Sequence, residues 1–207
     1  PGNPGSALTF EVDEGTHSPV LLFAYPRTGQ TTGSLRAQVK LELGSLYDQR
    51  PIGTHPIMPL VAESFPTLFR EPTCPVVALE AERTFWEKAT LLHAEYHRPS
   101  DRPLPIGFSR HYYDLHCLSQ SPRGERALAD VAMLARVRTH KQTYFRSGWA
   151  HYDTAVPGSL RLVPSPERRA QIERDYRGMA DMFMATPPPF AMIVAQLGAI
   201  ERQINGA

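Results

Sequence analysis

The stretch Gly107–Gln120, GFSRHYYDLHCLSQ, brings together groups that can exchange protons or bind phosphate. A helix here places Arg110 one turn before Asp114 and Cys117 one turn after it. Burying a carboxylate without a partner is costly. Asp114 is therefore expected to form a structural ion pair, with Arg110 as the simplest partner, or to belong to a functional site.

Two further segments carry charged side chains beside apolar residues. Lys88 lies in FWEKATLL with no acid three or four residues away. It is either a lysine whose stem covers apolar surface or one that is aimed at phosphates. In the segment QVKLEL, alternation places Lys40 and Glu42 on one strand face and the apolar residues on the other. A half-buried sheet with a charged outer face is one interpretation, and a carboxylate presented to a metal or a hydroxyl is the other.

Histidines and arginines suggest two more kinds of site. His93 and His97 are spaced as on a zinc-binding helix, but HAEYH is not an HExxH motif. A metal hydrolase that also uses His111 is the weaker hypothesis. Residues 136–146 contain no acid and several cations, which predict either a phosphate-binding patch or a solvated helix face. These cations are Arg136, Arg138, Lys141 and Arg146.

The elements that must position these residues change type along the chain. Alternating and apolar runs predict strands over 7–12, 18–26, 35–44 and 75–79. A short helix is possible around 60–65, in a proline-rich segment. Longer helices are expected over 81–97, 109–118, 124–138, from 165 onward, and over 190–205, with Ser109 as a cap of the second of these. The prediction is an α+β protein, with an antiparallel β-meander in a domain of residues 1–80 and a helical bundle in residues 81–207.

Composition narrows the class of protein. The 207 residues are 42% hydrophobic and 21% charged, so a folded core is expected rather than disorder. A formal net charge of +1 gives no bulk attraction to nucleic acid or membrane, so any basic site must be local. The two cysteines form no CxxC pair, which indicates a reduced, cytoplasmic protein without a zinc signature. No apolar run approaches the length of a membrane span.

Four segments together resemble the AbiEii/AbiGii nucleotidyltransferase toxin family. They are, in order, RAQVKLELG, ERTFWEKATLLHAEYHR, FSRHYYDLHCL and ERDYRGMADMFM. The resemblance runs over most of the chain, and the FWEK and SRHYYDL segments are its most specific parts.

The resemblance implies a polymerase-β-like nucleotidyltransferase core followed by a helical region. It implies transfer of a nucleotide from a nucleoside triphosphate to an acceptor, with Mg²⁺ as cofactor, tRNA as the acceptor in characterised relatives and a cognate antitoxin as partner. Lys88 would bind the triphosphate, and Glu42 or Asp114 would orient or deprotonate the acceptor hydroxyl. The substrate-binding residues would be Lys40, Arg110, Arg138 and Lys141.

One departure from the family pattern matters for activity. The family's metal motif is a Gly-Ser followed downstream by Asp-x-Asp, whereas this chain has Gly5–Ser6 and the adjacent pair Asp13–Glu14. The sequence therefore resembles the C-terminal two-thirds of a family member and is expected to be inactive as given. The alternative is a non-catalytic helical interaction module. Its dimer or antitoxin interface would be the apolar stripe over 190–204 and the segment MADMFM, although burial in the core of the same chain is the commoner fate of such stripes.

Overall fold

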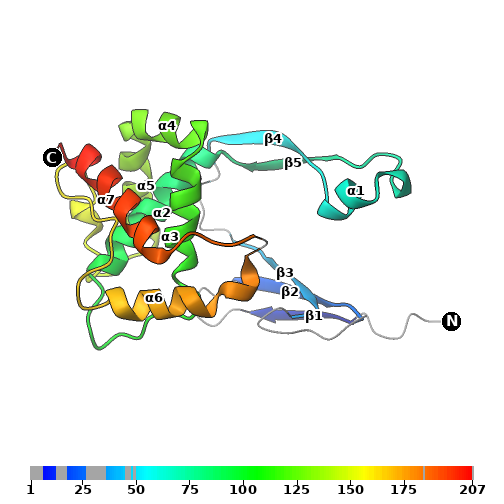
Figure 1. Cartoon of the computed structure of the whole chain (residues 1–207), viewed down its shortest axis with the longest axis horizontal. Coiled ribbons are helices and arrows are strands. Elements are labelled where there is room, and N and C mark those ends of the chain that lie inside the picture. The colour runs from blue at the N-terminus through cyan, green and yellow to red at the C-terminus, as the bar shows by residue number, and fades with distance from the viewer. Residues whose placement is uncertain are drawn as a thin grey trace. The chain divides into compact units, whose positions relative to one another are not determined.

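A computed structural model describes residues 7–12, 18–26, 36–44, 48, 50–183 and 185–206. The chain forms two compact units (Figure 1). One comprises residues 1–47 with 177–187, and the other comprises residues 48–176 with 188–207. The boundary proposed at residue 80 stays a prediction.

The smaller unit contains a three-stranded antiparallel sheet. Its strands, in the order β1-β2-β3, are Ala7–Val12, Pro19–Ala24 and Gln38–Glu42. Phe23 pairs with both Leu8 and Val39, so one face carries apolar residues from all three strands. These three side chains are exposed, which corrects the expectation of a half-buried sheet for the described residues. Residues 177–187, with the 3₁₀ turn η3 (Ala180–Met182), belong to the same unit.

The larger unit begins with a β-hairpin that the sequence did not reveal in full. Strand β4 (Ile52–Ile57) pairs antiparallel with β5 (Cys74–Leu79). The chain between them forms the short helix α1 (Leu60–Ser64) and the 3₁₀ turn η1 (Pro66–Leu68). Figure 1 shows the hairpin as a two-stranded ribbon with α1 at its far end. Strand β5 confirms the prediction over 75–79.

Helices form the body of this unit. They are α2 (Ala81–Tyr96), α3 (Arg110–Ser119), α4 (Pro122–Ala129), α5 (Val131–Tyr144), α6 (Arg169–Gly178) and α7 (Phe190–Asn205). A further 3₁₀ turn, η2, covers Tyr152–Thr154. Helix α2 lies at the centre and contacts α3, α4 and α5. Its stripe residues Phe85, Ala89 and Leu92 are fully buried, so burial of this stripe stabilises the helix that carries Lys88. Small antiparallel sheets followed by helices confirm the α+β class.

Three helix starts differ from the sequence-based expectation. Helix α6 begins at Arg169 rather than at residue 165. The predicted helix over 124–138 is broken at Asp130, which ends α4 and caps α5 by accepting a hydrogen bond from the Met133 N–H. Ser109 makes no side-chain capping bond to its own helix. Instead, the Asp175 carboxylate accepts hydrogen bonds from the backbone N–H groups of Gly107 and Ser109 and from the Ser109 hydroxyl. The start of α3 is thus fixed by an acid from α6.

The apolar stripe of α7 belongs to the core. Phe190, Ile193 and Leu197 are buried within the chain. Of the two interpretations of this stripe, intrachain core is therefore the one that the structure supports, and a dimer or antitoxin interface is not.

Candidate functional site

Lys88 on α2 and Asp114 on α3 meet although 26 residues separate them in sequence. The Lys88 Nζ lies 2.6 Å from Asp114 Oδ2 and 3.0 Å from His111 Nδ1. The side chains of Lys88 and Asp114 are 23% and 38% exposed, so a ligand from solvent has access to the pair. The Lys88 ammonium therefore has specific polar partners. Asp114 pairs with a residue of the neighbouring helix rather than with Arg110 of its own helix.

The hydrogen-bonding roles in this group follow from chemistry. An ammonium only donates, so His111 Nδ1 must accept from Lys88 and its ring proton must sit on Nε2. The 3.8 Å separation between His111 Nδ1 and Asp114 Oδ2 is too long for a hydrogen bond. Two of the three Lys88 N–H groups are used by these partners. The third Lys88 N–H has no partner among the residues that the structure describes and can donate to a ligand.

Charge states at neutral pH are set by burial and by these contacts. Burial raises the pKa of Asp114, but the hydrogen bond from Lys88 and the Lys88 charge outweigh it, so its pKa lies below the ordinary value. Burial, with the nearby Lys88 charge, lowers the pKa of His111. At neutral pH the Asp114 carboxyl group is therefore ionised and the His111 imidazole is uncharged.

Glu42 and Lys40 lie in the other compact unit. They form an ion pair with each other along β3, and both side chains are exposed. Glu42 therefore has a cationic partner within its own strand. Its participation in a site with Lys88 and Asp114 stays a prediction.

Three further residues were predicted to bind substrate. Arg110 is exposed, and the partners of Asp114 among the described residues are Lys88 and His111, so the expected Arg110–Asp114 restraint is wrong. Lys141 is almost fully buried and forms a 2.7 Å ion pair with Glu87. Arg138 is half-buried, and its Nε has no hydrogen-bond partner among the described residues. Of the three, Arg110 is the most accessible to a ligand.

The structure reveals a polar cluster that sequence reasoning missed. Fully buried Arg83 donates to Asp48 Oδ2 at 2.6 Å, to Glu87 Oε1 at 2.9 Å and to the Arg50 carbonyl at 2.7 Å. The spacing of Arg83 and Glu87 along one helix is a readable signal. Asp48 carries no such signal, because it follows the predicted strands and meets its partners only through the fold.

The described residues do not assemble a Mg²⁺ site. They contain no group of three or more His, Cys, Asp or Glu side chains that could hold a metal ion. The Asp114 carboxylate is occupied by an ammonium rather than by a second carboxylate. Gly5–Ser6 and Asp13–Glu14 lie outside the described residues. Mg²⁺ therefore stays an expectation from family resemblance.

The histidine cluster has a structural explanation. His93 is fully buried, and its Nδ1 accepts from the Arg161 N–H at 3.1 Å. Its Nε2 must then carry the proton, which it donates to the His151 carbonyl at 3.0 Å. The His97 ring packs between those of His93 and His151, with centroid distances of 4.8 and 4.7 Å. His93 has no lone pair left for zinc, which removes the basis of the hydrolase hypothesis.

This cluster predicts acid sensitivity. Burial lowers the pKa of His93 from 6.5 to about 4, so the unfolded chain binds a proton there before the folded chain does. The free energy of unfolding therefore falls as the pH drops from 6.5 to about 4, by up to about 3 kcal/mol for His93. Urea unfolding at a series of pH values measures the slope. A His93→Gln variant is expected to show a shallower dependence, and identical slopes in the two proteins would contradict this assignment.

Comparison with known proteins gave one match. A family model described as nucleotidyl transferase AbiEii toxin, type IV TA system, matches residues 4–196. No curated protein and no solved structure matched the chain. Among the described residues, every helix is too short or too polar to cross a membrane.

Proposed function

Because the chain belongs to the AbiEii nucleotidyltransferase toxin family, we propose that Lys88 and Asp114 form the nucleotide-handling part of a nucleotidyltransferase site. The observation that carries this proposal is their contact across α2 and α3, open to solvent on one side. The residues that the resemblance assigns to catalysis on these helices are thus neighbours in space.

The proposed chemistry is attack of an acceptor hydroxyl on the α-phosphorus of a nucleoside triphosphate. A new oxygen–phosphorus bond forms, the bond from the α-phosphorus to the oxygen that bridges it to the β-phosphorus breaks, and pyrophosphate leaves, while the hydroxyl proton passes to solvent water. Lys88 would donate its remaining N–H to a phosphate oxygen and offset the charge of the triphosphate. Asp114 has a lowered pKa and is a weak base, so we assign it to orienting the acceptor hydroxyl rather than to removing its proton. Lys88-dependent binding of a nucleoside triphosphate is the measurable consequence.

The remaining assignments follow from the family. We propose an RNA acceptor, with tRNA as the first candidate, and a cognate antitoxin as the protein partner. Mg²⁺ would supply charge neutralisation at the phosphates when it is bound. The cysteines Cys74 and Cys117 are free and exposed, which supports a reducing compartment such as the cytoplasm.

We also propose that these 207 residues by themselves do not transfer nucleotides. They contain no two aspartates separated by a single residue, so the Asp-x-Asp carboxylate pair is missing from them. Incubation of the protein with tRNA, Mg²⁺ and each α-labelled nucleoside triphosphate in turn is expected to leave the RNA unlabelled. Labelled RNA that depends on Mg²⁺ would overturn the proposal.

A second candidate function is a non-catalytic interaction module. The observation that favours it is the apolar surface of the β4–β5 hairpin and its tip, where Ile57, Leu60, Phe65 and Leu68 are exposed. In this case a homodimer or an antitoxin complex would cover the hairpin. Light scattering should then show association that is lost in Leu68→Ser, whereas a monomer at all concentrations and with the antitoxin present would exclude this role.

A further inference from the structure

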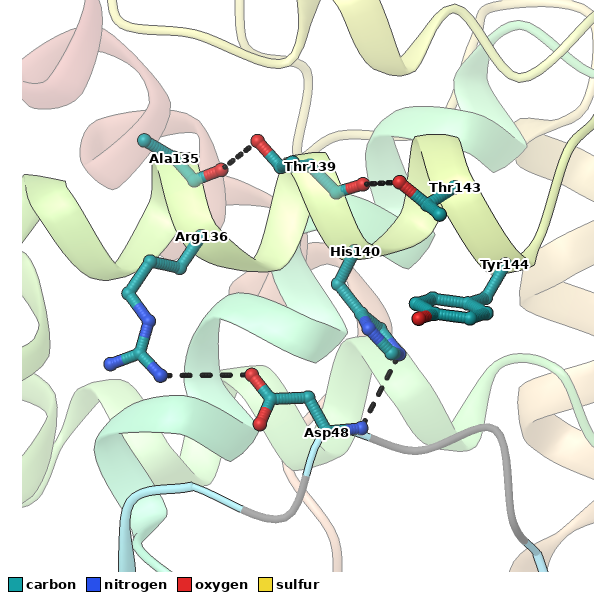
Figure 2. Close-up of a pocket in the computed structure, with 7 residues that line it drawn as sticks. All are labelled: Asp48, Ala135, Arg136, Thr139, His140, Thr143 and Tyr144. Carbon is teal, nitrogen blue, oxygen red and sulfur yellow. Dashed lines mark hydrogen bonds and ion pairs between the residues drawn. The ribbon is translucent and has the colours of Figure 1, made fainter.

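A hollow of about 470 Å³ lies along one face of α5. The hollow is shallow and open to solvent, with Asp48 across from the helix, which contributes residues from successive turns. These are Ala135, Arg136, Thr139, His140, Thr143 and Tyr144. Figure 2 shows Arg136 at one end, His140 in the middle and Tyr144 at the other end. The volume lies in the range of small-molecule sites.

The charged residues around this hollow carry one positive charge in excess. Arg83, Lys141 and Arg136 are linked in one network by the carboxylates of Asp48 and Glu87. Arg83 and Lys141 are buried and held by contacts of 2.6 to 2.9 Å. Arg136 is 53% exposed and lies 3.6 Å from Asp48, which has Arg83 as its closer partner. The excess charge therefore lies on Arg136, which can exchange its long contact for an anion.

The other end of the hollow is aromatic. The Tyr144 and His140 rings lie 4.8 Å apart with 39° between their planes. His140 Nε2 accepts from the Asp48 N–H, so in the neutral ring the proton sits on Nδ1. Tyr144 is exposed, and its ring is available for stacking.

Hydroxyl groups lie between the two ends. Thr139 and Thr143 donate their protons to the carbonyls of Ala135 and Thr139, so their oxygens can still accept hydrogen bonds. Arg136 and Tyr144 are eight residues apart, which corresponds to about 12 Å along the helix axis. Along α5 the hollow thus presents a cation first, then hydrogen-bond acceptors, and then an aromatic ring.

From this order we infer that the hollow binds one nucleotide, with its phosphate at Arg136 and its base stacked on Tyr144. A nucleotide has the same sequence of parts, namely an anion, a sugar with hydroxyl groups and a flat aromatic base. Stacking on an aromatic side chain tolerates any base, and an arginine suits phosphate. The nucleotide is either free or part of a single-stranded RNA. The inference does not depend on the function proposed for Lys88 and Asp114.

Equilibrium titration tests this site without any transfer reaction. The probes are AMP and UMP, followed by calorimetry, and labelled short poly-adenosine and poly-uridine RNAs, followed by fluorescence polarisation. Tyr144→Ala is expected to weaken binding about 5- to 150-fold, the range for one lost stacked base. Arg136→Gln is expected to weaken it about tenfold or more, through loss of a charged hydrogen bond.

Matched variants separate the site from general effects. Tyr144→Phe keeps the ring and should bind as the natural protein does, and Arg70→Gln removes an exposed cation from the hairpin with no loss of binding. Binding of the mononucleotides identifies a free nucleotide as a source of the ligand, whereas binding of the RNAs alone identifies a strand. The inference fails if no probe binds saturably, or if Tyr144→Ala and Arg136→Gln bind as tightly as the natural protein.

Discussion

Replacement of Trp86 by alanine is expected to lower the free energy of unfolding by about 3–5 kcal/mol. Trp86 is fully buried on the central helix α2, and its indole N–H donates to the Ala127 carbonyl at 3.0 Å. The ring also meets Phe85 edge to face at 5.1 Å. Truncation leaves a large cavity between α2 and α4, because the surrounding helices can only partly collapse. Urea denaturation measures the change, which is large compared with the stability of a typical domain.

Two further variants show whether packing is the cause. Trp86→Phe keeps most of the apolar volume and loses the hydrogen bond. It should therefore lower the free energy of unfolding clearly less than Trp86→Ala does. The Ala127 carbonyl keeps a second donor, the Asp130 N–H, in that variant. Ile106→Ala changes a side chain that is almost fully exposed and should alter stability by about 0.5 kcal/mol or less. Equal effects of Trp86→Ala and Ile106→Ala would contradict the assignment of the core to α2.

Replacement of Lys88 by alanine is expected to weaken nucleoside triphosphate binding by about 10- to 150-fold. This range corresponds to the loss of one hydrogen bond between an ammonium and a phosphate. The same variant leaves Asp114 and its negative charge facing the incoming phosphates, which adds repulsion. Calorimetric titration of each of the four ribonucleoside triphosphates, with and without Mg²⁺, measures the effect.

A control for charge alone is available in the same unit. Arg126→Ala removes an exposed cation of α4 that pairs with Glu82 and not with Lys88, His111 or Asp114 among the described residues. It should leave triphosphate binding within about twofold, since a single surface charge acts weakly through solvent. If Arg126→Ala and Lys88→Ala weaken binding equally, the interaction is non-specific and the role of Lys88 is lost.

Local sequence patterns predicted the helices and strands in which the spacing of apolar residues fits only one type of structure. Helix α2 follows from apolar residues at helical spacing, β1 and β3 follow from alternation, and β2 follows from an apolar run that ends at a proline. Strand β4 was missed because Gly53 and Pro56 read as turn residues, whereas pairing with β5 overrides that preference. The break at Asp130 was missed because residues on both sides favour helix, and only the capping bond to Met133 shows where one helix ends.

The sequence was enough to identify the candidate residues of the site but not the contacts between them. Lys88 and Asp114 stood out as charges beside apolar neighbours, yet their partner lay beyond the reach of helical spacing. The nearby Arg110 was a better partner by sequence, but α3 directs Asp114 toward α2, where Lys88 already lies. The hollow on α5 depends on Asp48, which reaches the helix through the Arg83 network. No local pattern encodes such long-range contacts.

Asp114 holds Lys88 in a position to bind phosphate, and the variant Asp114→Asn gives the sharpest test of this role. The carboxylate offsets part of the Lys88 charge and repels a triphosphate bound beside it, and a part-exposed ion pair of this kind contributes up to about 1 kcal/mol. Titration of this variant with a nucleoside triphosphate should therefore show binding that is roughly two- to fivefold tighter than in the natural protein. Binding that weakens as much as in Lys88→Ala would show that the pair is a structural ion pair, and the account would be contradicted.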